Sequence, residues 1–313
     1  MSELFVWPEE AAIPFPGKAN LLDVATTAGI GISHLCGGRA RCSTCRVRIM
    51  EGGELLSPRT DAEQAMAERL DFPEEVRLAC QTEAEGAVKL WRLVLDQVDI
   101  DMASQLGEGH YVGPVGREVE AAVMFVDVAG FTSMSEHLPA YDVVHILNRF
   151  FNRAGAAVEG NGGVVDNYLG DGLLALFGVH DEPEPALSAV KAAFGICEAA
   201  SNMSTYLTWI YNQPFHVRVG IGLGDVIFGL MGDESSARET VIGDVVNTAS
   251  RLEAANKTTG TTILVTDAIK MHTDTHVEYG RHFDLDLRGK DGHVLAHEPI
   301  SLIEAEGAPQ ETS

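Results

Sequence analysis

Four of the five cysteines lie in the first third of the chain, where their spacing suits a metal cluster. They are Cys36, Cys42, Cys45 and Cys80. Gly37 and Gly38 let the backbone wrap closely, so that its N–H groups can point at thiolate sulfurs. A structural zinc site usually shows two short Cys-x2–4-Cys pairs, but only Cys42 and Cys45 are spaced in this way. The pattern therefore favours an iron–sulfur cluster over a zinc site or unrelated buried thiols.

A second group of candidate residues consists of carboxylates at the ends of predicted strands. Residues 119–128 predict a buried strand that is interrupted near its end by Asp127. A lone carboxylate in such a strand is unfavourable unless it is paired or binds a metal ion. Ser133 and Glu136 have capping-box spacing, so we expect a helix to begin just after Asp127. The free N–H groups of that helix start could bind phosphate.

Asp171 is the second such carboxylate, in the turn of a hairpin predicted for strands 164–169 and 173–178. Aspartate is common in turns, so Asp171 alone indicates little. Together with Asp127, however, it could bridge two Mg²⁺ or Mn²⁺ ions, which is the arrangement for in-line attack at phosphorus.

Asn247 and Arg251 form a third candidate pair, on a helix predicted for residues 245–255. Residues four apart share one helical face, and the apolar residues of the segment supply a separate packing stripe. The pair could therefore face a ligand. Because an arginine on a helix surface is usually just solvated, this pair alone is a weak indication.

The motifs around these residues resemble the catalytic domain of class III nucleotidyl cyclases, the adenylate and guanylate cyclases. They read FVDVAGFTSMSE, YLGDGLLALFG and VIGDVVNTASRLE, in this order. The resemblance implies a βαββαβ palm-like domain over residues 117–303 that works as a head-to-tail homodimer with its catalytic sites at the interface. It also implies that the product is a 3′,5′-cyclic nucleotide, with pyrophosphate released.

The resemblance assigns a role to each candidate residue. Asp127, Asp171 and the backbone carbonyl of Val128 would bind the two metal ions in one protomer. Asn247 and Arg251 of the other protomer would orient the ribose and stabilise the pentavalent transition state, where cations offset the developing charge.

Four further positions are expected to contact the phosphates. Phe131 and Thr132 come just before the helix predicted after Asp127, whose first backbone N–H groups are free. Arg288 and Lys290 match the basic loop that precedes the last strand in the family, and would bind the distal phosphates. A charged hairpin turn is the alternative interpretation of these last two.

The residue expected to read the base departs from the family pattern. Adenine-using members usually carry Lys four residues before the second metal-binding acid, and guanine-using members tend to carry an acid there. This chain has Asn167 at that position, with Thr240 as its expected partner. An amide offers both a donor and an acceptor and can therefore read adenine. We expect ATP as the substrate.

The cysteine motifs, CGGRARCSTC and RLACQT, resemble the [2Fe–2S] ferredoxins of the β-grasp type. The five-residue gap between Cys36 and Cys42 resembles the adrenodoxin-like branch more than the plant-type branch, which has four. The resemblance covers residues 1–96. It implies one [2Fe–2S] cluster, bound by the four cysteines, and one-electron chemistry.

Shorter patterns predict the elements that position the cysteines. Asn20 is expected to cap a helix over residues 21–28, and a second helix is expected over 61–70. Strands are predicted at 46–50 and 88–95. Together with these elements, the two resemblances imply an α+β fold, with a β-grasp ferredoxin domain followed by the palm-like cyclase domain.

Composition limits the classes of partner. The chain carries 46 acidic against 22 basic residues, a formal net charge of −24. Such a charge argues against nucleic-acid binding and against adsorption to anionic membranes. We find no signal-peptide pattern and no spanning segment, and expect a cytoplasmic protein. Residues 97–116 are expected to form a connector, and residues 304–313 a disordered tail.

Two functions remain in view. The first is an adenylate cyclase that works by a two-metal mechanism, with the redox state or integrity of the cluster as its regulator. The second is a ferredoxin-type electron carrier, whose cyclase-like domain dimerises or binds nucleotide with little turnover. Both would need an electron donor to the cluster.

Overall fold

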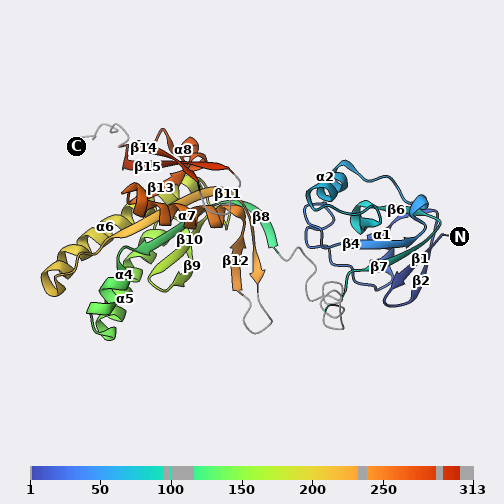
Figure 1. The fold of residues 1–313 in the computed structure, drawn as a ribbon, viewed down its shortest axis with the longest axis horizontal. Helices are drawn as coiled ribbons and strands as arrows, with labels where there is room; N and C mark the ends of the chain where they lie inside the picture. The colour runs from blue at the N-terminus through green and yellow to red at the C-terminus, as the bar shows by residue number, and fades with distance from the viewer. Residues whose placement is uncertain (1, 95–98, 100–115, 232–237, 287–291, 304–313) are drawn as a thin grey trace, which may run out of the picture. The chain divides into compact units, whose positions relative to one another are not determined.

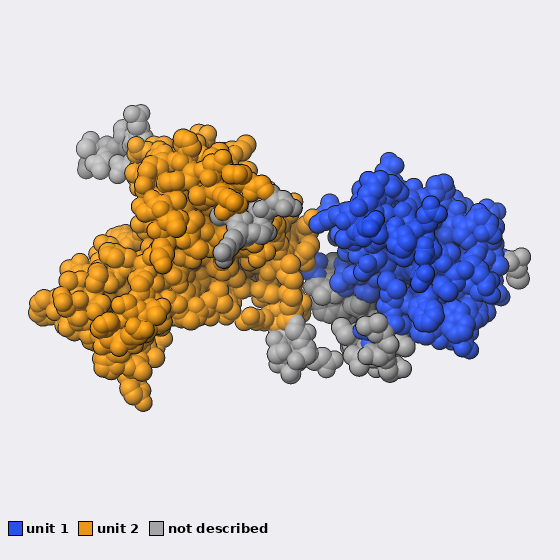
Figure 2. All heavy atoms as spheres, in the orientation of Figure 1, with its two compact units in different colours: residues 1–116 blue, residues 117–313 orange. Residues whose placement is uncertain are grey.

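The computed structural model describes residues 2–94, 99, 116–231, 238–286 and 292–303. The chain forms two compact units, residues 1–116 and 117–313 (Figures 1 and 2). The connector and tail predicted at 97–116 and 304–313 lie outside the described residues, apart from residues 99 and 116. Within the described residues, no helix is both long and apolar enough to cross a membrane.

The first unit has the predicted β-grasp arrangement, a mixed sheet with a helix packed on one face. The strand order is β2-β1-β7-β4-β5. These strands are β1 (Ser2–Trp7), β2 (Ala11–Phe15), β4 (Arg46–Glu51), β5 (Val76–Leu78) and β7 (Ala87–Arg92). The central pair β1–β7 is parallel, and the other pairs are antiparallel. The core lies between the inward-facing residues Leu4, Val6, Val88 and Leu90 and helix α1 (Leu21–Thr27).

Two capped helices and two short turns complete this unit. The predicted cap of α1 is confirmed, because the Asn20 side chain accepts hydrogen bonds from the backbone N–H groups of Leu22 and Asp23. Thr60 caps α2 (Asp61–Arg69) in the same way, at the N–H of Glu63. Short strands β3 (Lys18–Asn20) and β6 (Glu83–Glu85) pair with each other. The 3-10 turns are η1 (Gly53–Leu55) and η2 (Ala79–Gln81).

The second unit is built on an eight-stranded sheet with strand order β14-β15-β13-β11-β8-β10-β9, and with β12 paired to β11. Its strands are β8 (Gly116–Val128), β9 (Gly163–Leu169), β10 (Gly172–Phe177), β11 (Val217–Met231), β12 (Arg238–Ile242), β13 (Ile263–Thr266), β14 (Val277–Asp286) and β15 (His293–Leu302). Its helices are α4 (Phe131–His137), α5 (Ala140–Glu159), α6 (Pro185–Tyr211), α7 (Asp244–Thr259) and α8 (Asp267–Thr273). The sequence of elements confirms the βαββαβ prediction.

Strand β8 separates two hydrophobic clusters, since successive side chains of a strand point to opposite faces. Met124, Val126 and Val128 pack against residues of α5 and α6 in the larger core. Ala121 and Val123 pack on the other face, with residues of β12 and α7. By this alternation Asp127 lies on the face that α7 covers.

Glycines of β11 allow α7 to approach the sheet on that face. A Cβ added to Gly220 would lie 2.2 Å from the carbonyl oxygen of Ala249 and 2.2 Å from the backbone nitrogen of Glu253. A Cβ on Gly222 would lie 2.7 Å from a methyl carbon of Val245. Only a strand without side chains at these positions admits the helix backbone so closely, so the glycines fix the depth at which α7 sits.

The predicted capping box after Asp127 is wrong. Helix α4 begins at Phe131, and its N-cap is Gly130 with a φ of 77°, not Ser133. Ser133 lies inside the first turn. A glycine at the cap accepts the left-handed conformation without steric cost, and this conformation reverses the chain sharply after β8.

Replacing Gly220 with alanine is expected to destabilise the second unit by about 3 kcal/mol, because the new methyl group would meet helix backbone that cannot turn away. Calorimetry of the full chain measures this as a lower unfolding temperature of that unit. Gly224→Ala is the matched control on the same strand, since its Cβ would lie at an ordinary 3.5 Å from Val245. Equal unfolding temperatures in the two variants would contradict the close packing of α7.

Candidate active site and iron–sulfur site

The structure brings the two predicted metal-binding aspartates together. Asp127 lies near the end of β8 and Asp171 lies in the turn between β9 and β10. The antiparallel register pairs Leu173 with Val126, which aligns the turn with the end of β8. Gly172 permits this approach, because a Cβ there would lie 2.5 Å from the carbonyl oxygen of Val126.

The two carboxylates oppose each other electrostatically. Burial, together with the charge and hydrogen-bonding proximity of Asp171, raises the pKa of Asp127 to about 6. Two half-buried carboxylates within hydrogen-bonding reach repel when both are ionised. A divalent cation removes that repulsion and prefers oxygen ligands. The donor set therefore fits the Mg²⁺ or Mn²⁺ that the sequence predicts.

Arg218 and Glu253 belong to the same charged cluster and were missed from the sequence. The positive charge of Arg218 lowers the pKa of Asp127. Burial first, and then the charge of Asp127, raise the pKa of Glu253 to about 7, against the effect of Arg218. Alternation along β11 gave a signal for Arg218, since its neighbours Val217 and Val219 face the larger core. Nothing in the sequence pairs Glu253 with the acids, because that contact depends on how deeply α7 lies on β11.

Asn247 and Arg251 lie on α7 as predicted. They are on the side of this helix that points away from the two aspartates of the same chain. Ala249 packs on the face of the sheet that carries Asp127. Successive residues turn by about 100°, so Asn247 and Arg251, each two residues from Ala249, point about 160° away from it. Asn247 is exposed and Arg251 is half-buried. Within one chain, α7 therefore directs Asn247 and Arg251 away from Asp127 and Asp171.

Asn167 and Thr240, the residues predicted to read the base, are linked through Asp166, the neighbour of Asn167. The pairing of β9 with β10 skips Asp166, so that Leu174 opposes Asn167 and Ala175 opposes Val165. At this bulge the hydroxyl of Thr240 donates a 3.2 Å hydrogen bond to Oδ2 of Asp166. Burial raises the pKa of Asp166, while Thr240 and Arg238 oppose the rise. Asp166 is thus an acid beside the expected base site that the sequence pattern did not reveal.

Because the bulge at Asp166 interrupts the alternation of β9, Asn167 lies on the same side of the strand as Asp166. The next residue, Tyr168, packs against Phe151 of α5 with ring centroids 4.6 Å apart, and outside the bulge neighbouring residues of a strand face opposite sides. Asn167 consequently faces away from α5. An amide and a carboxylate therefore stand side by side, next to Thr240 of β12.

The remaining predicted phosphate contacts divide into two groups. Phe131 and Thr132 are the first two residues of α4, where Phe131 is half-buried and Thr132 is exposed. Arg288 and Lys290 lie outside the described residues, between β14 and β15.

The four predicted cysteines converge in the first unit as two pairs. The Sγ atoms of Cys45 and Cys80 are 3.3 Å apart, and the Cys36 side chain is hydrogen-bonded to Cys42. Backbone N–H groups of the same loop also lower the pKa of Cys36, against the opposing effect of burial. Two pairs of thiolate sulfurs surrounded by N–H donors fit a cluster of two irons, each bound by two cysteines. Cys197 lies on α6 of the second unit, where burial raises the pKa of its thiol to about 12.

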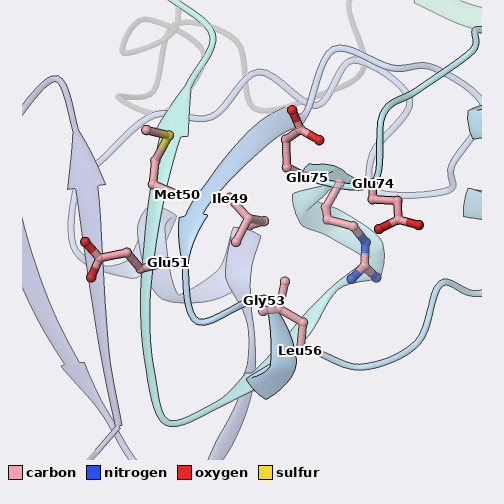
Figure 3. A pocket seen from close by; sticks show the side chains of 8 residues that line it. Ile49, Met50, Glu51, Gly53, Leu56, Glu74 and Glu75 are labelled. Carbon is pink, nitrogen blue, oxygen red and sulfur yellow. The ribbon is translucent and has the colours of Figure 1, made fainter.

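The first unit also contains a cavity of about 390 Å³ beside β4 and η1. Figure 3 shows Ile49 and Leu56 at this cavity, together with the acidic side chains of Glu74 and Glu75. None of the residues predicted as functional lines it.

Comparison with known proteins matches each of the two units to a protein family. Residues 115–297 match the adenylate and guanylate cyclase catalytic domain, and residues 4–85 match the 2Fe-2S iron-sulfur cluster binding domain. An adenylate cyclase of Anabaena cylindrica is 31% identical over 181 residues, which are 56% of this chain and 36% of the relative. Adenylate cyclase 1 of Rhizobium meliloti is 26% identical over 63% of this chain and 30% of the relative. The chain thus spans about a third of the length of these relatives.

Solved structures show the same fold in the second unit. The guanylyl cyclase Cya2 aligns with a TM-score of 0.56 and 26% identity, over 63% of this chain and 98% of that chain. The adenylyl cyclase CyaB from P. aeruginosa aligns with a TM-score of 0.55 and 22% identity, over the same shares. The chain therefore belongs to the adenylate and guanylate cyclase catalytic domain family and carries a [2Fe–2S] ferredoxin domain N-terminal to that catalytic domain.

Proposed function

We propose that this protein is an adenylate cyclase that converts ATP into 3′,5′-cyclic AMP and pyrophosphate. The observation that carries the proposal is the pair formed by Asp127 and Asp171, held side by side where β8 ends. Relatives that bear the name adenylate cyclase support the choice of reaction.

Each residue of the acid pair has a defined task in this reaction. Asp127, Asp171 and the carbonyl oxygen of Val128 would hold two Mg²⁺ or Mn²⁺ ions. When bound, the ions supply a lowered pKa for the 3′-hydroxyl and charge neutralisation for the leaving phosphates. Arg218 offsets part of the negative charge of Asp127. No side-chain nucleophile is needed, because the attacking oxygen belongs to the substrate.

The site is completed by a second copy of the chain. Asn247 and Arg251 point away from the acids of their own chain, so in a head-to-tail homodimer they would serve the acids of the partner. There Asn247 would orient the ribose, and Arg251 would stabilise charge on the pentavalent phosphorus. Phe131 and Thr132 would bind phosphate through their backbone N–H groups, and Arg288 and Lys290 would bind the distal phosphates.

Mixing two inactive variants tests this arrangement. Asp127→Ala and Arg251→Ala are each expected to lose activity on the order of 10³-fold. In a 1:1 mixture half of the dimers are mixed and carry one intact site, so activity should return to about a quarter of wild type. Cyclic AMP formation measures the recovery.

Asp127→Ala mixed with Asp171→Ala is the control, because both changes fall on the same half of the site and no intact site can form. Recovery in this control, or no recovery in the first mixture, would contradict a site shared between two chains.

We propose ATP as the substrate because the Asn167 amide can donate to N1 and accept from the 6-amino group of adenine. Asp166 stands beside it and accepts a hydrogen bond from the Thr240 hydroxyl. A second acid at the base would instead accept from the N1 and N2 hydrogens of guanine. Asn167→Asp should therefore shift the ratio of kcat/KM for ATP over GTP toward GTP by about tenfold.

Asn212→Asp is the matched control for this shift, since it adds the same charge at the exposed end of α6. Turnover of both nucleotides with Mg²⁺ and with Mn²⁺ measures the ratio. A wild-type preference for GTP, or an equal shift in the control, would contradict the proposal that Asn167 selects adenine.

We further propose that the cluster regulates the cyclase. The convergence of the four cysteines supports a loaded cluster, which also keeps electron transfer in view as a second function. Cyclic AMP formation is expected to differ between protein reduced with dithionite and protein oxidised under the same anaerobic conditions. Equal rates with an intact cluster would reject the coupling. An electron carrier would still reduce its acceptor after Asp127→Ala, which separates the two functions.

A further inference from the structure

The fourth cysteine, Cys80, is far in sequence from the other three and is positioned by side chains of its own neighbourhood. It lies on η2, and its backbone carbonyl accepts a 3.1 Å hydrogen bond from Nδ2 of Asn20, the N-cap of α1. The next residue, Gln81, is half-buried and directs its side chain back to the cysteine loop. This turn of chain is therefore tied both to a helix start and to the cluster loop.

The amide nitrogen of Gln81 lies among three acceptors. Nε2 donates a 2.8 Å hydrogen bond to the carbonyl oxygen of Gly38. It also lies 3.3 Å from the carbonyl oxygen of Cys80 and 3.6 Å from the Cys80 Sγ. An amide nitrogen has two hydrogens. With one directed at Gly38, the other is directed at the carbonyl and the sulfur of Cys80.

Thr60 fixes the orientation of this amide. Its hydroxyl oxygen accepts from the backbone N–H of Glu63 at 3.2 Å, and its single proton is donated to Oε1 of Gln81 at 3.0 Å. With Oε1 occupied by a donor, Nε2 must face the sulfur. The assignment of the two amide atoms thus follows from the hydrogen-bond network.

A buried ion pair anchors the far end of the same network. Glu63 is fully buried and holds Arg77 through two hydrogen bonds of 2.9 Å. The Glu63 carboxylate also accepts from the backbone N–H of Leu78 at 2.7 Å. Arg77 lines the cavity of about 390 Å³ described above. These bonds hold helix α2 against β5, the strand that leads into Cys80. Thr60, the N-cap of α2, is therefore held beside Gln81.

We propose that Gln81 is a positioning residue that raises the reduction potential of the [2Fe–2S] cluster by holding an amide N–H against the Cys80 sulfur, and that Thr60 holds Gln81 in that orientation. On reduction the cluster gains one electron from a low-potential one-electron donor, with no bond broken and no proton moved. The added charge spreads onto the sulfurs. A donor at a sulfur therefore stabilises the reduced cluster more than the oxidised one.

The test is the midpoint potential of the full chain, titrated under anaerobic conditions and followed by visible absorbance and by the signal of the reduced cluster in electron paramagnetic resonance. Gln81→Met removes the donor at nearly constant volume. It should lower the equilibrium constant for reduction about tenfold, which is about 59 mV for one electron. Thr60→Val should shift the potential in the same direction by less, and Thr60→Ser, which keeps the hydroxyl, should restore it.

Gln64→Met is the matched control. Gln64 lies on α2 of the same unit, but its side chain donates to Glu68 at 2.8 Å and takes no part in the network. Its potential should equal that of wild type. Iron content is measured for every variant, so that only loaded protein is compared.

Three outcomes would overturn the proposal: an unchanged potential in loaded Gln81→Met, an equal shift in Gln64→Met, or no difference between Thr60→Val and Thr60→Ser. If Gln81→Met fails to load iron, Gln81→Glu decides. That variant keeps the acceptor for Thr60 but replaces the N–H donor with a negative oxygen. It must therefore lower the potential at least as far as the shift expected for Gln81→Met. A wild-type potential in loaded Gln81→Glu would reject the role of the donor. These measurements of the reduction potential do not test the cyclase activity proposed above.

Discussion

The catalytic unit depends on one unfavourable interaction, the repulsion between two carboxylates that the fold holds within reach of each other. Strand β8 and the β9–β10 turn are joined by backbone pairing, so Asp127 and Asp171 cannot separate without breaking the sheet. Burial and then the charge of Asp171 raise the pKa of Asp127 to about 6. Such a pair is stable only with positive charge nearby. Arg218 supplies part of it, and divalent cations would supply the rest.

Packing on the same face of the sheet determines where the rest of the machinery lies. Because Gly220 admits the backbone of α7, Glu253 lies close enough to Asp127 and Asp171 for their charges, after burial, to raise its pKa, and Asn247 and Arg251 point to the other side of the helix. The close packing of α7 at Gly220 therefore sets the direction of Asn247 and Arg251. The proposed head-to-tail dimer rests on that direction. In the ferredoxin unit, the N-cap residues of α1 and α2 both contact the segment that carries Cys80.

Sequence reasoning found the residues whose types and spacing are specific to a chemistry. The four cysteines, the two aspartates and the order of the elements all followed from motifs read along the chain. Glu253 and Asp166 did not, because each depends on tertiary packing, on the depth of α7 and on the bulge of β9. Arg218 was missed although the alternation along β11 indicates its side of the sheet. The helix cap at Ser133 was wrongly predicted because Gly130, with its positive φ, ends the turn earlier than the capping pattern suggests.

Binding of Mn²⁺ tests the central claim most directly, because it reports on the acid pair without requiring turnover. Electron paramagnetic resonance can count the Mn²⁺ bound per chain in the presence of an ATP analogue that lacks the 3′-hydroxyl. The account predicts two ions per site in wild type, and loss of this binding in Asp127→Asn and Asp171→Asn alike, with the fold intact. Undiminished Mn²⁺ binding in both variants would show that the two carboxylates do not hold the metal ions, and the proposed mechanism would be wrong.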